Sequence, residues 1–228
     1  MGNVIELKNV DKVYSGLIDT QVLFGIDLSF EEGSFNSLVG ESGSGKSTLL
    51  NIMGTLDKPT RGELFIAGKR TNELSKNKLS ELRNSTIGFI FQFHYLLPEF
   101  TAVENVLIPY LIGRKGADRS SVKRADELFD ILGISSVKNN PANKMSGGQQ
   151  QRTSIARALI NNPKIILADE PTGNLDSENT ATIYKIFREI NQKYGTTFII
   201  VTHDRRIAEE TDRIVEIKDG RIVVEIKK

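Results

Sequence analysis

A glycine-rich segment ahead of position 48 has the residue types and spacing of a phosphate-binding loop. The segment consists of Gly40, Glu41, Ser42, Gly43, Ser44, Gly45, Lys46 and Ser47, with Thr48 directly after it. Glycines let backbone amides approach phosphate oxygens without a Cβ in the way, and the N-terminus of a following helix adds partial positive charge. We therefore expect the whole segment to bind a nucleotide, with Lys46 at its β- and γ-phosphates and Ser47 on Mg²⁺.

Two adjacent carboxylates follow the apolar run Ile165–Ala168. Neighbouring residues on a strand point to opposite sides, so Asp169 and Glu170 cannot share one role without a bend in the chain. We assign Asp169 to Mg²⁺, through its water shell, and Glu170 to the attacking water. In isolation the pair would be better explained as two solvated acids at a strand end, but the phosphate loop upstream favours the chemical role.

The strands that must position these groups are predicted from short runs of apolar and β-branched residues. The expected strands are Val4–Val10, Phe35–Val39, Ile87–Phe91, Lys164–Ala168, Thr197–Val201 and Ile214–Lys218. Several of them are continuously apolar, which is typical of a parallel sheet covered on both faces. The phosphate loop lies between one such strand and a predicted helix, Lys46–Met53, which is the context that such a loop requires.

Helical periodicity alternates with these strands and indicates an α/β fold. An apolar i, i+3, i+4, i+7 stripe predicts a helix from Asp176–Ser177 to Gly195, and a second helix is expected over Ser121–Leu132. Near the end of the sequence, Asp219–Gly220 predicts the two-residue turn of a hairpin whose second strand is Arg221–Ile226.

The composition excludes several classes of protein. The 228 residues include 30 Lys+Arg and 29 Asp+Glu, with a net charge of +1 and 39% hydrophobic residues. These values are typical of a globular protein and argue against wholesale binding of a nucleic-acid backbone. No stretch approaches the ~18–20 apolar residues of a membrane-spanning helix, and we expect no secretory signal. The absence of Cys from the sequence excludes disulfides and thiolate metal sites.

A third motif precedes the two carboxylates along the chain. It consists of Met145, Ser146, Gly147, Gly148 and Gln149. With the other motifs in this order and spacing, the sequence resembles the ATP-binding-cassette (ABC) ATPases, whose signature loop is Leu-Ser-Gly-Gly-Gln. Met145 departs from that pattern, but it is an apolar replacement of similar volume and should cost little. The resemblance covers essentially the whole chain.

This resemblance implies roles for further residues. Tyr14 would stack on the adenine base, and Ser146–Gln149 would bind nucleotide as the signature loop. Gln92 would be the glutamine of the Q-loop, with a place in the metal site and in catalysis. The segment Gly173-Asn174-Leu175-Asp176 would be the D-loop, with Asp176 at the nucleotide. His203 would be the switch histidine, which acts with Lys46 and Glu170 in catalysis.

The resemblance also implies the architecture. We expect one ABC ATPase domain over residues 1–228, built on a P-loop NTPase (RecA-like) core with a mainly parallel sheet. The core, together with an antiparallel β subdomain, would occupy residues 1–92 and 161–228. An inserted helical subdomain at residues 93–160 would carry the signature loop.

Cassettes of this family work as head-to-tail pairs, which implies a second copy of this chain as a partner. A signature loop carried on a separate lobe cannot reach the phosphate loop of its own chain. Ser146 and Gly148 would therefore contact the γ-phosphate that Lys46 of the other copy holds, so that two ATP molecules lie between two copies. Hydrolysis would weaken this closed state, because the γ-phosphate supplies contacts to both copies.

Within the family, residues 91–106, 109–113 and 169–176 are similar to the lipoprotein-releasing (LolD-type) group, whereas Gln149–Gln151 is nearer to the macrolide-exporter (MacB-type) pattern. The implied function is to hydrolyse ATP for integral-membrane permease subunits that extract lipoproteins from the inner membrane. The chain would lie at the cytoplasmic face of the inner (plasma) membrane, held there by those subunits.

Other functions remain as alternatives to lipoprotein release. Macrolide or antimicrobial-peptide exporters and FtsE-like cell-division ATPases belong to the same broad group. An ABC ATPase that acts on DNA or ribosomes is disfavoured, because such proteins usually carry two cassettes or long coiled coils, and this sequence has one phosphate loop and no sustained heptad run. We therefore expect no nucleic-acid partner.

Overall fold

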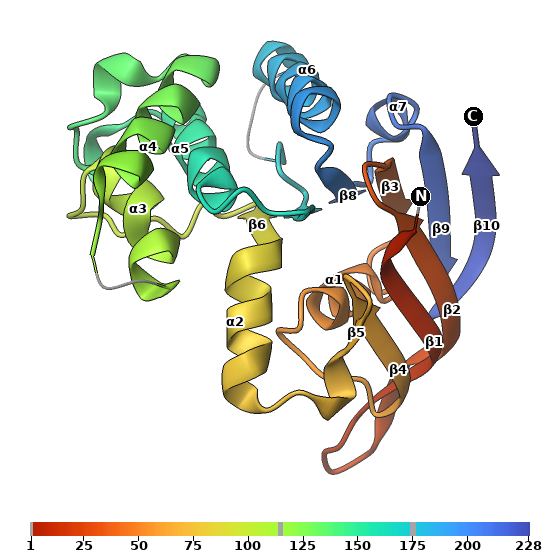
Figure 1. Ribbon diagram of the computed structural model, residues 1–228. Coiled ribbons are helices and arrows are strands. Elements are labelled where there is room, and N and C mark those ends of the chain that lie inside the picture. Colours follow the sequence, from red (N-terminus) through yellow and green to blue (C-terminus); the bar gives the residue numbers. More distant parts are fainter. Residues whose placement is uncertain (1, 114–115, 174–176) are drawn as a thin grey trace.

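The computed structural model describes residues 2–113, 116–173 and 177–228, and the strands in these ranges form two sheets (Figure 1). The first sheet is antiparallel, with the strand order β2-β1-β4-β5. Its strands are β1 (Asn3–Tyr14), β2 (Thr20–Glu31), β4 (Arg61–Ile66) and β5 (Lys69–Arg70). An antiparallel β element beside the main sheet is what the family resemblance implied.

Strand β1 is longer than the expected strand Val4–Val10, because β-bulges let its pairing continue. The register with β2 shifts between Leu7 and Val10, where Asn9 adopts a φ of 47°. Pairing then continues as far as Tyr14, which lies opposite Thr20. The expected end at Val10 is therefore wrong, and the extension places Tyr14 at the last position of the strand.

The second sheet carries the chemistry-bearing residues. Its order is β10-β9-β3-β8-β7-β6, with antiparallel pairing only between β9 and β10 among the described strands. Its strands are β3 (Phe35–Val39), β6 (Ile87–Phe91), β7 (Ile165–Asp169), β8 (Thr197–Val201), β9 (Arg213–Lys218) and β10 (Arg221–Lys227). The mainly parallel sheet and the C-terminal hairpin are as predicted, and β7 is shifted by one residue.

The parallel strands are buried on both faces, which explains their continuous apolar sequence. On β7, Leu167 packs into the apolar cluster that includes Leu49, whereas Ala168 packs into the cluster that includes Phe187. The first cluster joins the antiparallel sheet to one face of the main sheet, and the second lies on the opposite face. Because both faces are covered, polar groups that react with solvent or ligand must lie at the strand ends.

The helices occupy both sides of this sheet. They are α1 (Lys46–Met53), α2 (Lys76–Thr86), α3 (Ala102–Gly113), α4 (Arg119–Ile131), α5 (Gly147–Leu159), α6 (Ser177–Tyr194) and α7 (Arg205–Ala208), with 3-10 turns at Thr71–Glu73, Ser135–Val137 and Ala142–Lys144. Helices α3, α4 and α5 contact one another and lie together beyond β6 (Figure 1). In the described ranges, none of the helices combines the length and apolar character needed to cross a membrane.

Several elements were missing from the sequence expectations. Strand β2 was missed because Gly25, with a φ of 54°, and the polar residues beside it interrupt its apolar pattern. Helix α2 has few apolar residues, and only Leu82 and Thr86 are buried. Helix α4 begins two residues earlier than expected, at Arg119, because the side chain of Asp118 caps it in a capping box with Ser121.

Candidate active site

The loop between β3 and α1 has a backbone that requires glycine. Gly40 has a φ of 156°, and a Cβ added there would lie 2.2 Å from the carbonyl oxygen of Ile217. Gly45, at the N-cap of α1, has a φ of 105°, and no side chain caps this helix in the described structure. The first amides of α1 have no acceptor within the helix, so they remain available to an anion held by the loop.

Lys46 supplies a cation inside this loop. Its Nζ donates hydrogen bonds to the carbonyl oxygens of Gly40, at 2.9 Å, and Glu41, at 2.7 Å. Lys46 is buried. The neighbouring Ser44 is buried as well, and its Oγ has no hydrogen-bond partner among the described residues. Among the described residues the Lys46 ammonium donates to neutral carbonyls, and a bound phosphate would supply the negative charge that it lacks.

The carboxylate of Asp169 lies beside this loop. Asp169 ends β7, and its neighbours in the sheet are Phe91 on β6 and Val201 on β8. Burial raises the pKa of the Asp169 carboxyl, and a hydrogen bond with the hydroxyl of Ser47 opposes that effect. A hydroxyl and a carboxylate in contact are hard oxygen donors of the kind that Mg²⁺ prefers. These two residues fit the magnesium site expected from the sequence.

Glu170 and His203 form a pair at the ends of β7 and β8. Glu170 Oε1 lies 3.0 Å from His203 Nδ1. Glu170 adopts a φ of 44°, and its amide donates to the carbonyl oxygen of Val201 at 3.0 Å. A non-glycine residue with a positive φ marks a bend in the chain directly after Asp169, which breaks the strict alternation of strand side chains.

These groups converge on one cavity of about 540 Å³. It is lined by Val22, Gly40, Ser42, Gly43, Gly45, Lys46, Ser47, Thr48, Asp169, Glu170 and His203. Convergence follows from the parallel topology, which brings the carboxyl ends of β3, β7 and β8 to one edge of the sheet. Glu41 and Ser44 belong to the loop but do not line this cavity. Val22 was not expected, because the strand that carries it was missed.

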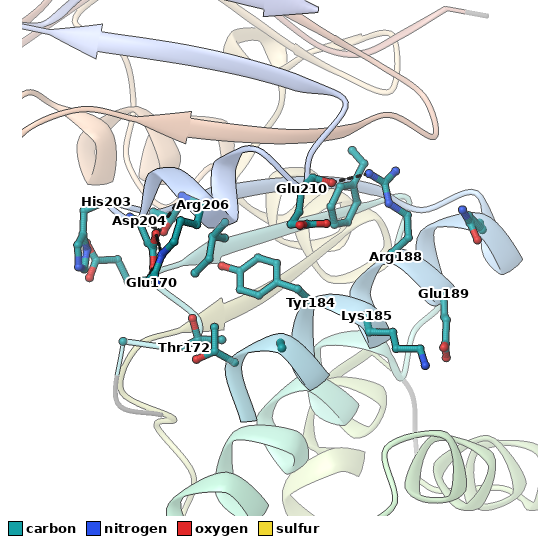
Figure 2. A pocket seen from close by; sticks show the side chains of 17 residues that line it. Glu170, Thr172, Tyr184, Lys185, Arg188, Glu189, His203, Asp204, Arg206 and Glu210 are labelled. Atoms are coloured by element: carbon teal, nitrogen blue, oxygen red, sulfur yellow. Dashed lines mark hydrogen bonds and ion pairs between the residues drawn. The ribbon is translucent and has the colours of Figure 1, made fainter. Parts of the chain in front are cut away.

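A second cavity of about 870 Å³ adjoins the first and shares Glu170 and His203 with it. Figure 2 shows this pair at one end of the cavity, Arg188 at the other end and Tyr184 between them. Arg188 is held by hydrogen bonds to the carboxylate of Asp212 and the carbonyl oxygen of Glu210. The Glu170–His203 pair therefore lies at the junction of two cavities.

The structure places Gln92 near this edge but outside the lining of the first cavity. Gln92 follows β6, whose last residue, Phe91, pairs with Asp169. Its side chain packs on Gly173, where an added Cβ would lie 2.8 Å from Gln92 Nε2. The remainder of the segment expected to be the D-loop, Asn174-Leu175-Asp176, lies outside the described residues.

Tyr14 also lies outside the lining of the phosphate cavity. Its hydroxyl donates to Asp57 Oδ2 at 2.9 Å, and Lys12 Nζ lies 4.6 Å from the centre of its ring. Lys12 Nζ in turn contacts Asp57 Oδ1 at 2.7 Å. Tyr14 pairs with Thr20, close in the chain to Val22, which does line the cavity. Tyr14 was named from the sequence as a candidate, whereas Lys12 and Asp57, which hold it, were not.

The residues of the expected signature loop are at the start of α5, away from the cavity lining. Ser146 is the N-cap of α5, and its Oγ accepts from the amide of Gln149 at 3.3 Å. The side chain of Gln149 completes a capping box by accepting from the amide of Ser146 at 2.9 Å. Ser146 and Gly147 are exposed. One copy of the chain therefore does not bring this loop to its own phosphate loop.

Comparison with known proteins identifies relatives of this site and fold. The family described as "ABC transporter" matches residues 23–173. The lipoprotein-releasing system ATP-binding protein LolD 1 of Rhodopseudomonas palustris is 51% identical, over 97% of this chain and 99% of that protein. The protein of the same name, LolD, from Aquifex aeolicus is 47% identical, over 99% of each chain.

A solved structure also resembles the chain throughout. It is a dimeric ATP-binding cassette in a post-hydrolysis state, bound to ADP and Pi. That protein is 44% identical, with a TM-score of 0.90 over 98% of each chain.

Proposed function

The chain belongs to the ABC transporter family, and on that premise we propose that it is the ATP-hydrolysing subunit of a transporter that releases lipoproteins from a membrane. The observation that carries the ATPase activity is the convergence of the phosphate loop, Asp169, Glu170 and His203 on one cavity. Relatives that match nearly the full chain bear the lipoprotein-releasing name, which favours this cargo over macrolides or peptides.

ATP is the proposed substrate, held by its phosphates in the loop 40–48. The uncapped first turn of α1 and the ammonium of Lys46 supply the positive charge, and the glycines let the backbone approach. We propose that Mg²⁺ is held by Ser47 and Asp169, with Gln92 beside them. When bound, the ion would neutralise charge on the phosphates, as it does in phosphoryl transfer generally.

The residues of the chain then act by orientation and by charge. Glu170 would accept a hydrogen bond from the attacking water and polarise it, because Glu170 and Lys46 line the same cavity. His203 Nδ1 faces Glu170 Oε1, and an ionised carboxylate can only accept a hydrogen bond, so Nδ1 carries the proton of that contact. The imidazole would thereby fix the direction of the Glu170 side chain.

We propose that two copies of the chain enclose two ATP molecules, with each signature loop completing the site of the other copy. The separation of Ser146 from the phosphate cavity within one chain supports this arrangement. The dimeric state of the similar cassette solved with ADP and Pi supports it as well. The exposed N-terminus of α5 would then face the γ-phosphate that Lys46 of the other copy holds.

Membrane subunits would dock beside the helical group α3–α5. An aromatic cluster is exposed there: Phe93 is 63% exposed and Tyr95 is 66% exposed, with ring centres 6.5 Å apart. Arg157 on α5 fixes the segment by donating to the carbonyl oxygens of His94, at 2.7 Å, and Tyr95, at 2.6 Å. Exposed apolar patches of this kind mark interaction sites. The chain would be held through this patch at the cytoplasmic face of the inner membrane.

The ATPase assignment is tested with Glu170→Gln, which keeps the shape of the side chain and removes its charge. We expect hydrolysis to fall by on the order of 10²–10⁴, while ATP, but not ADP, shifts the variant to a dimer in size-exclusion chromatography. Glu73→Gln, an exposed acid paired with Arg70 far from the cavity, is the matched control and should hydrolyse as the wild type does. Unchanged turnover in Glu170→Gln would refute the assignment.

The cargo is tested separately. The tagged chain is purified from membranes of its own cell in mild detergent, and the subunits that co-purify in stoichiometric amounts are identified. Reconstituted into vesicles that contain a fluorescent lipoprotein, the complex should release it only with hydrolysable ATP. The lipoprotein assignment would be wrong if the complex released a macrolide but no lipoprotein, or if the chain were recovered with ribosomes or DNA. Neither result would contradict the proposed ATPase chemistry.

A further inference from the structure

We propose that Gln151 is a positioning residue for Glu170, and that it makes the reactivity of one ATP site depend on where helix α5 lies. This inference rests on the proposed function, because it concerns the efficiency of the same hydrolysis. Its basis is a buried hydrogen bond between α5 and the residue that directly follows Glu170.

The contact is between Gln151 and Pro171. Gln151 is 1% exposed, and its Nε2 donates to the carbonyl oxygen of Pro171. A carbonyl oxygen can only accept, so the amide nitrogen of Gln151 must face it. The opposite end of the amide, Oε1, lies 3.4 Å from Ser154 Oγ. Ser154 Oγ donates mainly to the main-chain carbonyl oxygen of Gln151, at 2.8 Å, so the bond from Nε2 to Pro171 and the burial of the side chain are what give the amide one orientation.

The turn that Gln151 holds is the one that aims Glu170. Glu170 has a φ of 44°, a conformation that persists only when surrounding contacts fix it. Its own amide is bonded to Val201 and its carbonyl oxygen accepts from the amide of Gly173 at 3.1 Å. These two bonds lie within the sheet edge and the turn itself. Of these three hydrogen bonds, the one from Gln151 to Pro171 joins the turn to the helices α3–α5.

Helix α5 therefore connects two functional ends of the molecule. Its N-cap is Ser146, in the loop that would contact ATP held by the second copy, and Gln151 lies little more than one turn further along the same helix. A helix moves as a rigid element, so a displacement at Ser146 is carried to Gln151. The bond to Pro171 then passes that displacement to the carboxylate beside His203. ATP bound across the interface thereby biases the alignment of Glu170 in the chain that contacts it.

The test compares full-length Gln151→Met, which keeps the volume but removes the donor, with wild type. We expect kcat to fall on the order of 10- to 100-fold, as small displacements of a catalytic group do, while the Kd for ATP is unchanged. Because hydrolysis is slowed and binding is retained, ATP should shift Gln151→Met to the dimer, as it does for Glu170→Gln. Loss of structure alone would not produce this gain of dimer.

Asn191→Leu is the matched control. Asn191 is also a buried amide that lines neither cavity, and it donates to the carbonyl oxygens of Gly33 and Thr196, both at 2.8 Å. Its replacement should lower the melting temperature and leave kcat unchanged. If Gln151→Met does not fold, Gln151→Asn, whose amide is one methylene too short to reach Pro171, should show the same loss of kcat with retained dimerisation.

A double variant, Gln151→Met with Glu170→Gln, isolates the route of the effect. If Gln151 acts through Glu170, the double variant should hydrolyse no more slowly than Glu170→Gln alone. The inference would be overturned if the double variant hydrolysed ATP more slowly than Glu170→Gln. It would also be overturned if Gln151→Met kept its kcat or lost ATP-driven dimerisation. The proposed function fails differently, through normal turnover in Glu170→Gln itself.

Discussion

The carboxylate of Glu170 and the imidazole of His203 face one another at the ends of two adjacent strands, with 3.0 Å between Oε1 and Nδ1. The histidine side chain is 71% exposed, whereas that of Glu170 is 26% exposed. The less exposed partner is fixed by its backbone, and the more exposed one has room to move. In the proposed site, His203 would therefore orient Glu170 while keeping the freedom to respond to a ligand in the cavity.

Replacement of His203 should show what this contact contributes. His203→Ala removes the donor to Glu170 without changing the phosphate loop, so we expect kcat to fall by on the order of 10²-fold and the Kd for ATP to change little. Steady-state hydrolysis and equilibrium binding of a fluorescent ATP analogue provide the two numbers. A variant that loses ATP binding and retains its turnover at saturation would contradict this role.

The local motifs could be predicted because each depends on neighbours in the chain. The glycine spacing between Gly40 and Gly45 determines the shape of the loop, and the apolar run before Asp169 identifies a buried strand. Their convergence also follows from sequence, because parallel strands place their carboxyl ends at one edge. The fold class, the family and the placement of Glu170 and His203 at a shared cavity were accessible in this way.

Other contacts could not be predicted because they join segments far apart in the chain. Lys12 meets Asp57 across 45 residues, and Gln151 meets Pro171 across 20 residues. In sequence, a lone Asp or Gln is more often a solvated surface residue than a partner in a buried network. The extension of β1 to Tyr14 was equally hidden, since a bulge changes the alternation on which a strand prediction depends.

Asp169 should reduce the stability of the nucleotide-free protein. Burial raises the pKa of its carboxyl, so the folded state binds this proton more tightly than the unfolded chain does. The free energy of unfolding therefore falls as the pH rises from the ordinary carboxyl range through the raised pKa, and the ionised group is destabilising at pH 7.

The variant Asp169→Asn keeps an oxygen for Ser47 and cannot ionise. We expect it to melt a few degrees higher than wild type at pH 7, given about 2–4 °C per kcal/mol for a chain of this size, with the difference shrinking as the pH falls. Adding ATP and Mg²⁺ should reverse the order, because wild type gains more stability from the metal-bound nucleotide than a variant without the Asp169 carboxylate does. Differential scanning fluorimetry over a pH series measures both effects, and a lower melting temperature for the apo variant at pH 7 would refute the argument.

Asp57 should orient Tyr14 and stabilise the fold. Burial raises the pKa of the Asp57 carboxyl, but hydrogen bonds from Lys12 and Tyr14 outweigh it and lower the pKa. A carboxyl whose pKa is lowered in the folded state stabilises the fold at pH values above the ordinary carboxyl pKa. That stabilisation is lost as the pH falls through the lowered pKa. Asp57→Ala should therefore lose about 1 kcal/mol at pH 7, and the deficit should narrow below about pH 4.

Comparing Asp57→Ala with Tyr14→Phe distinguishes the contribution of the Tyr14 ring from that of its hydroxyl contact. If the ring binds the adenine base, Asp57→Ala should weaken ATP binding several-fold and leave the binding of inorganic triphosphate unchanged. Tyr14→Phe keeps the ring, and the Lys12 ammonium near it, and should bind ATP almost as wild type does. Equal losses for ATP and triphosphate in Asp57→Ala would place its effect on the phosphate loop instead.

Gly40→Ala should disable the phosphate loop through the backbone. Gly40 has a φ of 156°, and a Cβ added there would lie 2.2 Å from the carbonyl oxygen of Ile217. Because that distance is too short, β9 and the loop cannot both keep their positions in the variant. The carbonyl oxygen of Gly40 also accepts from Lys46, so a shift of this residue displaces the ammonium. We expect ATP binding to be lost and the free energy of unfolding to fall by clearly more than in a comparable glycine variant elsewhere.

Gly68→Ala provides that comparison. Gly68 has a φ of 76°, and a Cβ there would meet nothing within 4 Å. It lies in the turn between β4 and β5, away from the cavity, so its replacement reports the cost of the left-handed backbone alone, about 1–2 kcal/mol. Urea denaturation measures both variants. If Gly40→Ala costs no more than Gly68→Ala and retains ATP binding, then the close approach to Ile217 does not shape the loop.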